Sequence, residues 1–515
     1  MTEEVKLRRY HAPVWSEPII MEMGHKGERG IIIPEAEEEV QATVGDAERY
    51  IPAEVRRQEL PKLPELAQPQ VLRHFLHLTQ ETLGMEENID IGHGTCTMKY
   101  SPKVNEILAG MPQVTEVHPS QDEETIQGIL EILYKFDLMC RELSGMDQFT
   151  FQSGGGTQAT FVNACILRAY HEANGELEHR DEVITTIFSH PCDTATPTTV
   201  GFKVISLMPD ENGYPDLEAL KAACSERTAG LMITNPEDTG IYNPRIEEYV
   251  NAIHAVGGLC FYDQANLNGI MGIARAREAG FDACHFNLHK TFSSPHGCFG
   301  PGCGAYGCKE ELVKFLPVPI VSFDGEKYHL DYNRPHSIGK VREFFGNVEV
   351  VLKSYAWVMA MGADGLLEAA RVSVINNNYL DKLLMAIPGL TKPYAEGKFR
   401  LDQVRYSWQK LLDDTGCGTE DIKRRMVDFG IQNYFASHHP WIVPEPMTPE
   451  ACETFSKEDC EYWAAVIRQV VHEAYTNPEV VKTAPHNSTI HKIDADVLNN
   501  PQKWAMTWRA YLRKK

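Results

Sequence analysis

The sequence has no apolar run long enough to cross a membrane, and its first residues do not contain the apolar centre of a secretory signal. Basic residues are also scarce: 49 lysines and arginines stand against 72 acidic residues, for a formal net charge of −23. Nucleic-acid binding requires a basic surface, whereas an acidic surface is typical of a soluble cytosolic protein. We therefore expect a cytoplasmic protein whose partners include neither a nucleic acid nor a membrane.

The usual cysteine patterns of metal sites and redox motifs are also missing. The thirteen cysteines are an odd number without a secretory signal, which indicates free thiols in a reducing compartment. Cys298, Cys303 and Cys308 are evenly spaced, but no CxxC pair or zinc-type histidine pair accompanies them. The sequence therefore predicts no metal site.

The length and composition predict more than one globular domain. A chain of 515 residues with 43% hydrophobic residues and 38 glycines is typical of an α/β protein of two or three domains. We predict an N-terminal arm at 1–70, a large α/β domain at 71–325, and linker helices with a smaller C-terminal α+β domain at 326–515. The polar, acid-rich arm is predicted either to wrap around a partner subunit or to be a mobile terminus, and its composition fits both.

Short apolar segments and amphipathic segments alternate through the central part of the chain. Residues 123–144 have the period of an amphipathic helix, with Leu138 and Met139 among the side chains expected to face inward. The alternation that follows predicts a mostly parallel sheet, in which cofactors bind at the carboxyl ends of the strands. Beyond it we expect helices at 350–370, 374–386, 419–429 and 457–475, a strand at 398–408, and a terminal helix packed on the protein.

One lysine stands out because of the residues around it. Lys290 follows His289 in a segment of small and hydroxyl residues, and Asp263 ends an apolar segment shortly upstream. A lysine can hold pyridoxal phosphate (PLP) as a Schiff base, and a carboxylate can keep the pyridine nitrogen protonated. The alternative is an ordinary surface lysine that follows a strand.

A glycine-rich loop precedes this lysine in the chain. The segment that begins FTFQS at residue 149 is apolar and runs into Gly155, Gly156 and Thr157, and a helical pattern follows from about Gln158. Backbone N–H groups at the start of a helix, together with its dipole, form a binding site for a phosphate. A tight strand-to-helix turn is the alternative, but the position before the lysine segment favours phosphate binding.

Several segments resemble a known family. Residues 287–293, NLHKTFS, followed by PHG and GPG, resemble the cofactor-lysine segment of the glycine cleavage system P-protein, in particular the β subunit of its two-subunit bacterial form. Residues 94–102, GTCTMKYSP, resemble that family's GSCTMKYNP. The similarity runs from about residue 71 to about 365 and returns at 474–485. The resemblance implies a PLP-dependent, aminotransferase-like fold of type I.

The resemblance also implies a reaction and its partners. In this family glycine displaces the cofactor lysine, here Lys290, and loses its carboxylate as CO2. The remaining aminomethyl group passes to the lipoyl arm of a carrier protein. His190 corresponds to the histidine that stacks on the cofactor ring, and His190 and His289 can transfer protons near neutral pH. A related α-type subunit, in a homo- or hetero-oligomer, is also implied.

The sequence departs from the family pattern around these same residues. The family's PAAGAHGE is SGGGTQAT at 153–160, AHGTNPAS is SHPCDTAT at 189–196, DGAN is DQAN at 263–266, and a family glycine is replaced by Phe299. The family's CMHE segment is absent near 398–404. A divergent PLP enzyme that acts on another amino acid without a lipoyl acceptor is therefore one alternative. A non-catalytic partner subunit is another, although a subunit without activity would not need Lys290.

Overall fold

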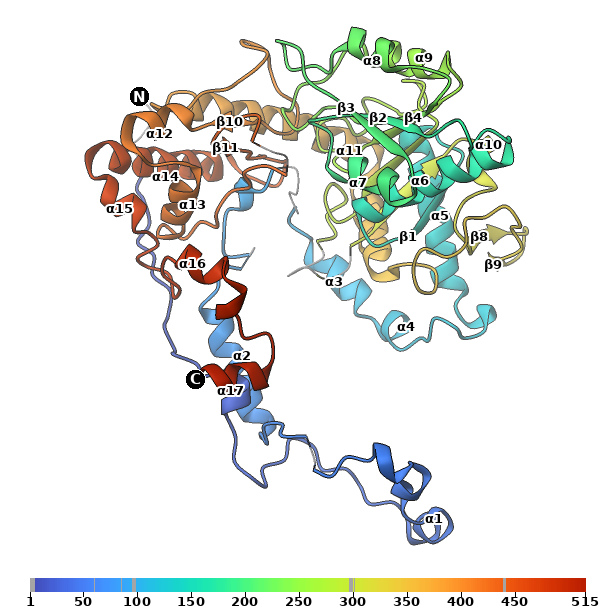
Figure 1. The fold of residues 1–515 in the computed structure, drawn as a ribbon, viewed down its shortest axis with the longest axis vertical. Helices are drawn as coiled ribbons and strands as arrows, with labels where there is room; N and C mark the ends of the chain where they lie inside the picture. Colours follow the sequence, from blue (N-terminus) through green and yellow to red (C-terminus); the bar gives the residue numbers. More distant parts are fainter. Residues whose placement is uncertain are drawn as a thin grey trace.

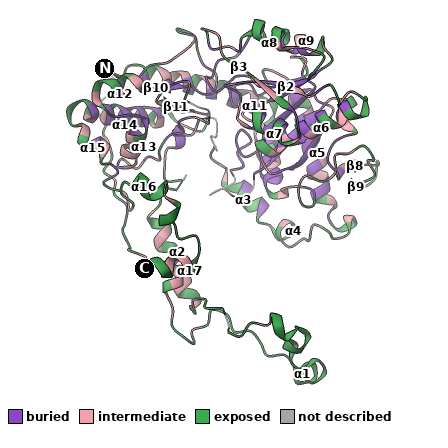
Figure 2. Cartoon of the chain, viewed as in Figure 1, coloured by how far each residue is buried: buried purple, intermediate pink, exposed green. Residues whose placement is uncertain are grey.

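The chain folds into two lobes and a long arm that projects from them (Figure 1). The structure is a computed structural model, and it describes residues 5–59, 61–84, 86–94, 99–295, 300, 302–438 and 441–515. Buried residues concentrate inside the two lobes, whereas the arm is almost entirely exposed (Figure 2). The domain boundaries at residues 70 and 325 stay predictions.

The larger lobe is built on a seven-stranded sheet in the order β1-β7-β6-β5-β4-β2-β3. β7 pairs antiparallel with β1 and with β6, and all the other pairings are parallel, so the remaining six strands run in one direction. This mostly parallel sheet confirms the predicted α/β class. The strands are β1 Gln148–Ser153, β2 Glu182–Thr186, β3 Lys203–Leu207, β4 Thr228–Thr234, β5 Leu259–Asp263, β6 Ala283–Asn287 and β7 Gly304–Cys308.

Helices cover both faces of this sheet and bury two apolar clusters against it. On α5, Leu130, Leu133 and Phe136 are buried, but Leu138 is 43% exposed, so the expectation that it faces inward was wrong. Two residues beyond Phe136 is about 200° around a helix, which turns Leu138 toward solvent. The helices of this lobe are α5 Gln127–Ser144, α6 Gly156–Ala173, α7 Cys192–Thr199, α8 Leu217–Ala223, α9 Ile246–His254 and α10 Glu310–Val313.

The long helix α11 (Val348–Leu384) leads from the sheet to the smaller lobe. It breaks at Gly362, where φ is 65°, rather than between residues 370 and 374 as predicted. The expected strand at 398–408 is reduced to β10 (Tyr406–Ser407). In the segment before it, the Arg400 side chain donates to the backbone carbonyls of Tyr394 and Ala395.

A separate core around Trp408 and Trp463 holds the smaller lobe together. Its helices include those predicted at 419–429 and 457–475. Its remaining elements are α12 Gln409–Thr415, α13 Thr419–Val427, β11 Pro446–Met447, α14 Lys457–Thr476 and α15 Pro478–Lys482. The hairpin of β8 (Ile320–Phe323) and β9 (Tyr328–Asp331) lies instead against α5 of the larger lobe.

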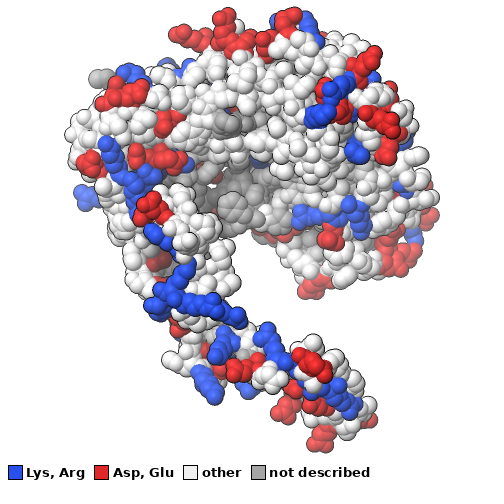
Figure 3. Space-filling model, in the orientation of Figure 1, with Lys and Arg blue, Asp and Glu red and all other residues white. Residues whose placement is uncertain are grey.

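The C-terminal tail lies along the N-terminal arm. Tyr511 donates to Glu22 (3.1 Å), and Thr489 donates to the carbonyl of Pro13 (2.8 Å). No residue of α17 (Trp508–Lys514) is fully buried, so the terminal helix lies on the surface of the arm, where Tyr511 bonds it to Glu22. Basic side chains gather near this end of the chain, and acidic ones gather near α8 and α9 (Figure 3). The short helices of the arm and its connection are η1 Ile20–Glu22, α1 Glu38–Val44, η2 Ala47–Tyr50, η3 Ala53–Val55, α2 Gln68–Gln80, η4 Asp90–Gly92, α3 Lys103–Ala109, α4 Pro112–Thr115 and η5 Glu123–Thr125, and those of the tail are α16 Ala495–Leu498 and η6 Pro501–Lys503.

Within the described residues, no helix combines the length and the apolar character needed to cross a membrane.

Candidate active site

The predicted site residues come together at one edge of the sheet. The glycine loop follows β1, His190 follows β2, Asp263 ends β5, and Lys290 follows β6. Because these four strands run in the same direction, their carboxyl ends meet at one edge, which is where ligands bind in open α/β sheets. The fold therefore brings into one region residues that are up to 135 positions apart in the sequence, from Gly155 to Lys290.

Lys290 lies in a tight turn directly after β6. Its backbone N–H donates to the carbonyl of Asn287 (3.0 Å), and its residue is only 7% exposed. The hydroxyl of the next residue, Thr291, accepts the N–H of Leu267 (2.8 Å), which ties the turn to the segment that follows β5. Lys290 is therefore buried, which excludes the alternative of a solvated surface lysine.

Asp263 lies inside the protein at the end of β5, where it is 2% exposed. Its Oδ1 accepts the N–H of Ala265 (2.9 Å) and lies 3.5 Å from Nε2 of His285. Burial lowers the pKa of His285 to about 4, and the charges of Lys290 and His190 add to that effect against the opposing charge of Asp263. The imidazole is therefore neutral, and its contact with Asp263 is not a salt bridge.

The glycine loop is shaped by close approach to neighbouring side chains. A Cβ at Gly156 would lie 2.8 Å from Nδ2 of Asn287, and one at Gly154 would lie 1.7 Å from Nη1 of Arg342. α6 begins at Gly156, so its first backbone N–H groups are at this loop. A side chain at either position would displace its neighbour, and the guanidinium of Arg342 lies against the loop. Thr157 is the exposed second residue of α6.

The two predicted histidines lie on different sides of this region. Nδ1 of His190 accepts the N–H of Cys192 (3.1 Å), and its ring contacts that of His438 in the smaller lobe, with 4.6 Å between centroids. Nδ1 of His289 accepts the N–H of Cys303 (3.3 Å), and its Cε1 lies 3.9 Å from the position of a Cβ on Gly155. His190 thus faces the second lobe, and His289 faces the glycine loop.

Buried acids that the sequence prediction missed also lie here. Asp193, at the start of α7, is 0% exposed, and neither of its carboxylate oxygens has a hydrogen-bond partner within the described residues. Its carboxylate, that of Asp263 and the thiol of Cys192 lie within 4.8 Å of one another. Burial raises the pKa of Glu237 to about 8. Asp193 stands in a segment that departs from the family pattern, and that departure was the available signal.

The smaller lobe contributes a second group of charges. Glu450 accepts hydrogen bonds from Nδ2 of Asn266 (2.9 Å) and of Asn268 (2.5 Å), in the segment after β5. Arg405 pairs with Asp238 (3.0 Å) beyond the end of β4. These bonds join positions more than 160 residues apart, so no local motif could have indicated them.

Asp402 belongs to the same group from the smaller lobe. Burial and then the charge of Glu450 raise the pKa of Asp402 well above its usual range, and the charge of Lys290 opposes this. The second lobe therefore places acids against the lysine turn.

Some predicted features lie outside the described residues. Phe299 and Cys298 fall there, as do residues 95–98 of the GTCTMKYSP segment. Cys303 and Cys308 are described and buried, and all eleven described cysteines are free.

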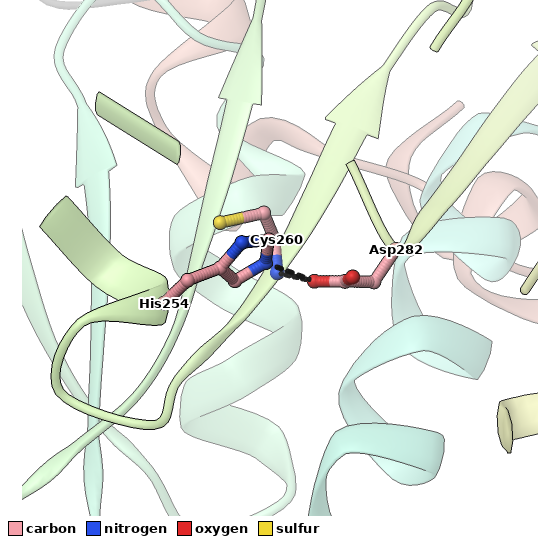
Figure 4. Close-up of side chains that lie close together, drawn as sticks. All are labelled: His254, Cys260 and Asp282. Carbon is pink, nitrogen blue, oxygen red and sulfur yellow. Dashed lines mark hydrogen bonds and ion pairs between the residues drawn. The ribbon is translucent and has the colours of Figure 1, made fainter. Parts of the chain in front are cut away.

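A second cluster, at the opposite edge of the sheet, resembles a metal site but is already satisfied (Figure 4). His254 Nε2 (2.8 Å) and the N–H of Cys260 (2.7 Å) bond one oxygen of Asp282, and Lys309 bonds the other (2.9 Å). Burial raises the pKa of the Cys260 thiol well above its usual range, whereas metal binding needs the thiolate. The lysine charge would also repel a cation, so this cluster is structural.

The chain matches known proteins along nearly its whole length. Residues 144–326 match the aminotransferase class-V family. The chain is 43% identical over 507 residues, 98% of both chains, to a probable glycine dehydrogenase (decarboxylating) subunit 2 of Pyrococcus abyssi. It is 41% identical over 504 residues, also 98% of both chains, to the protein of the same name from Thermococcus kodakarensis.

Solved structures show the same fold. A glycine decarboxylase (P-protein) of the glycine cleavage system in inhibitor-bound form superposes with a TM-score of 0.71 at 20% identity, over 85% of this chain and 99% of that one. A NifS-like protein superposes with a TM-score of 0.56 at 18% identity, over 74% and 98% of the two chains. These two superpositions confirm the predicted type I fold. Because relatives named glycine dehydrogenase (decarboxylating) subunit 2 are 37–43% identical to the chain over nearly its full length, the chain belongs to that family.

Proposed function

We propose that this protein decarboxylates glycine with PLP held on Lys290, and that it passes the aminomethyl group to a lipoyl carrier protein. The observation that carries the proposal is the convergence of Lys290, Asp263 and the glycine loop at the carboxyl edge of the sheet, in a chain of this family. The full-length relatives bear the name of a decarboxylating glycine dehydrogenase subunit. The substrate in that name is the first one to test.

PLP is the cofactor of this family, and the residues of the edge fit it. The ligand must present hydrogen-bonding groups, because several buried polar atoms here have no partner within the described residues, among them those of Asp193, His285, Ser153 and Asn287. The glycine loop offers backbone N–H groups without any Cβ, beside the cation of Arg342. A phosphate at the loop and a ring between Asp263 and His190 would use both features.

Each residue has a defined task in this arrangement. Bound PLP supplies an electron sink that stabilises negative charge on the α-carbon once CO2 leaves. Nζ of Lys290 is the covalent attachment point, and the Asp263 carboxylate holds a proton on the ring nitrogen. Gly155, Gly156 and Thr157 bind the phosphate. The ring of His190 would cover the cofactor, and the imidazoles of His190 and His289 would move protons beside it.

The arm supports an assembly of more than one chain. It projects from the lobes, and three consecutive isoleucines, Ile31, Ile32 and Ile33, are 74–80% exposed. An exposed apolar segment of this kind is typical of a surface that packs on another chain. We therefore include an oligomer, with a related α-type subunit as the favoured partner, in the proposal. The free thiols and acidic charge support a cytoplasmic location.

Borohydride reduction tests the cofactor half of the proposal. The protein incubated with PLP should show a visible absorption band that disappears on reduction, and digestion should yield a pyridoxyl-modified Lys290 peptide. Lys221→Ala, which removes an exposed lysine on α8, is the matched control and should be modified normally. A colourless protein, or modification of another lysine, contradicts the assignment.

Isotope exchange tests the reaction. Labelled bicarbonate should enter the carboxyl group of glycine when the lipoylated carrier and a candidate α-type subunit are present, and Lys290→Ala should abolish the exchange. A panel of other amino acids, assayed for CO2 release with and without the carrier, serves as the comparison. Absence of exchange together with turnover of another amino acid would replace the proposal with the divergent-enzyme alternative.

A further inference from the structure

Asp193 is a buried acid whose carboxyl group has no hydrogen-bond or ion-pair partner among the described residues. It lies on α7 with none of its surface exposed, and neither oxygen of its carboxylate has a hydrogen-bond partner in the part of the chain that the structure describes. An ionised carboxylate buried without a partner costs several kcal/mol, so the group either takes up a proton or meets a cation.

The groups packed around Asp193 supply acid rather than a cation. The Asp263 carboxylate on β5 and the Cys192 thiol lie within 4.8 Å of it and of each other. Burial and then the charge of Asp263 raise the pKa of Asp193 well above its usual range. His285 on β6 is neutral because burial lowers its pKa. Among the described residues, His190, beside Cys192, and Lys290 are further ionisable groups of this region, and the charges of both reach His285.

We propose that Asp193 carries a proton at neutral pH and donates it in a hydrogen bond to the cofactor ring, beside the carboxylate of Asp263. This inference rests on the PLP site proposed above and adds a residue to it. A carboxylic acid has one O–H donor, and Asp193 finds no acceptor for it within the described residues. The ring of PLP carries an oxygen substituent that can accept such a bond.

The division of tasks follows from the positions of the two acids. Oδ1 of Asp263 already accepts the N–H of Ala265, whereas neither carboxylate oxygen of Asp193 accepts a hydrogen bond within the described residues. Two like charges at this separation are unfavourable, so one proton on the pair is the stable state. A hydrogen bond from a backbone N–H stabilises a carboxylate, and Asp263 receives one whereas Asp193 receives none within the described residues. We therefore assign the shared proton to Asp193.

Infrared spectroscopy of the cofactor-free protein tests the protonation directly. A protonated carboxyl group has a C=O band that a carboxylate lacks. The difference spectrum between wild type and Asp193→Asn at neutral pH should contain this band, whereas that between wild type and Asp364→Asn, an exposed acid on α11, should not. A difference spectrum with a carboxylate band instead would overturn the proposal.

Cofactor titration tests the donor. Asp193→Asn keeps a donor of the same shape, so it should bind PLP within about threefold of wild type, whereas Asp193→Leu, of similar volume, should bind about tenfold or more weakly. Circular dichroism checks that both variants fold. Leucine binding as tightly as wild type would overturn the donor role, and asparagine binding as weakly as Asp263→Asn would show that Asp193 carries the charge.

Two further outcomes distinguish a failure of the Asp193 proposal from a failure of the proposed function. If wild type binds no PLP, the proposed function and the donor role fail together, while the infrared band still decides the protonation. If elemental analysis finds one divalent cation per chain that Asp193→Asn loses, a metal occupies the pair and the proton does not. We expect that wild type binds PLP and that elemental analysis finds no divalent cation that Asp193→Asn loses.

Discussion

The two edges of the same sheet hold clusters of similar composition and opposite character. At the amino end of β5 and β6, the carboxylate of Asp282 receives three hydrogen bonds, from His254, Cys260 and Lys309. At the carboxyl end, Asp193 lies within 4.8 Å of Asp263 and receives none within the described residues. A buried acid with all its bonds made stabilises the fold, whereas one without partners indicates a place for a ligand.

Lys290→Ala should have the largest effect of any change at the carboxyl edge. The variant should form no borohydride-stable bond to PLP, and turnover should fall by at least about a thousandfold because the covalent attachment is lost. The midpoint of urea unfolding, measured without cofactor, should change little. A variant that keeps a tenth of wild-type turnover would remove Lys290 from the proposed role, with Lys221→Ala as the control.

Asp282→Asn should show the opposite profile. Removing the charge leaves Lys309 and His254 without their buried partner, which should reduce the free energy of unfolding by about 3 kcal/mol. PLP affinity should stay within about twofold of wild type, since the cluster lies at the other edge. Urea denaturation and PLP titration measure the two quantities, and loss of affinity without loss of stability would contradict the contrast.

The pH dependence of stability should differ in sign between the two acids. Burial raises the pKa of Asp282, but the hydrogen bonds and charges of His254 and Lys309 outweigh this and lower it overall. Its contribution is therefore present above the unfolded pKa of about 3.9 and is lost as the pH falls through the folded pKa. Burial raises the pKa of Asp193, so at this group the folded state keeps a proton that the unfolded state releases, and the contribution of Asp193 to stability falls as the pH rises above about 4.

Substitution should expose this difference. Asp193→Asn should raise the free energy of unfolding at pH 7 by about 1–3 kcal/mol, with the gain vanishing near pH 4, because asparagine needs no proton. The loss caused by Asp282→Asn should instead shrink as the pH falls toward the folded pKa of Asp282. Urea midpoints measured from pH 4 to 8 check both slopes, and parallel slopes would break the comparison.

A pair of glycines gives the smallest expected effects. Gly156→Ala places a Cβ 2.8 Å from Asn287 Nδ2, so PLP affinity should fall about tenfold as the loop shifts. Gly128→Ala on α5 meets nothing within 4 Å, and should leave PLP affinity unchanged while stabilising the helix by up to about 1 kcal/mol. Equal PLP affinities of the two variants would show that the loop does not hold the phosphate.

Much of the larger lobe could be predicted from the sequence because its signals are local. The apolar segment that ends at Asp263 and the glycines before α6 have short-range periods and turns, and parallel strands place their carboxyl ends together. The predictions that Leu138 is buried and that 398–408 forms a strand were wrong for a related reason. Whether an apolar side chain is buried, or a segment pairs as a strand, depends on neighbours that the local pattern does not contain.

The sequence by itself determined the family, the choice of Lys290 as the lysine proposed to hold the cofactor, and the order of the elements that carry it, because each depends on residue types at short spacing. Only the tertiary structure decided which acids are satisfied and which are not. It placed Glu450, Arg405 and Asp402 of the smaller lobe against the strand ends. It also buried Asp193 beside Asp263, because the state of a carboxyl group depends on the partners that folding brings within a few ångströms.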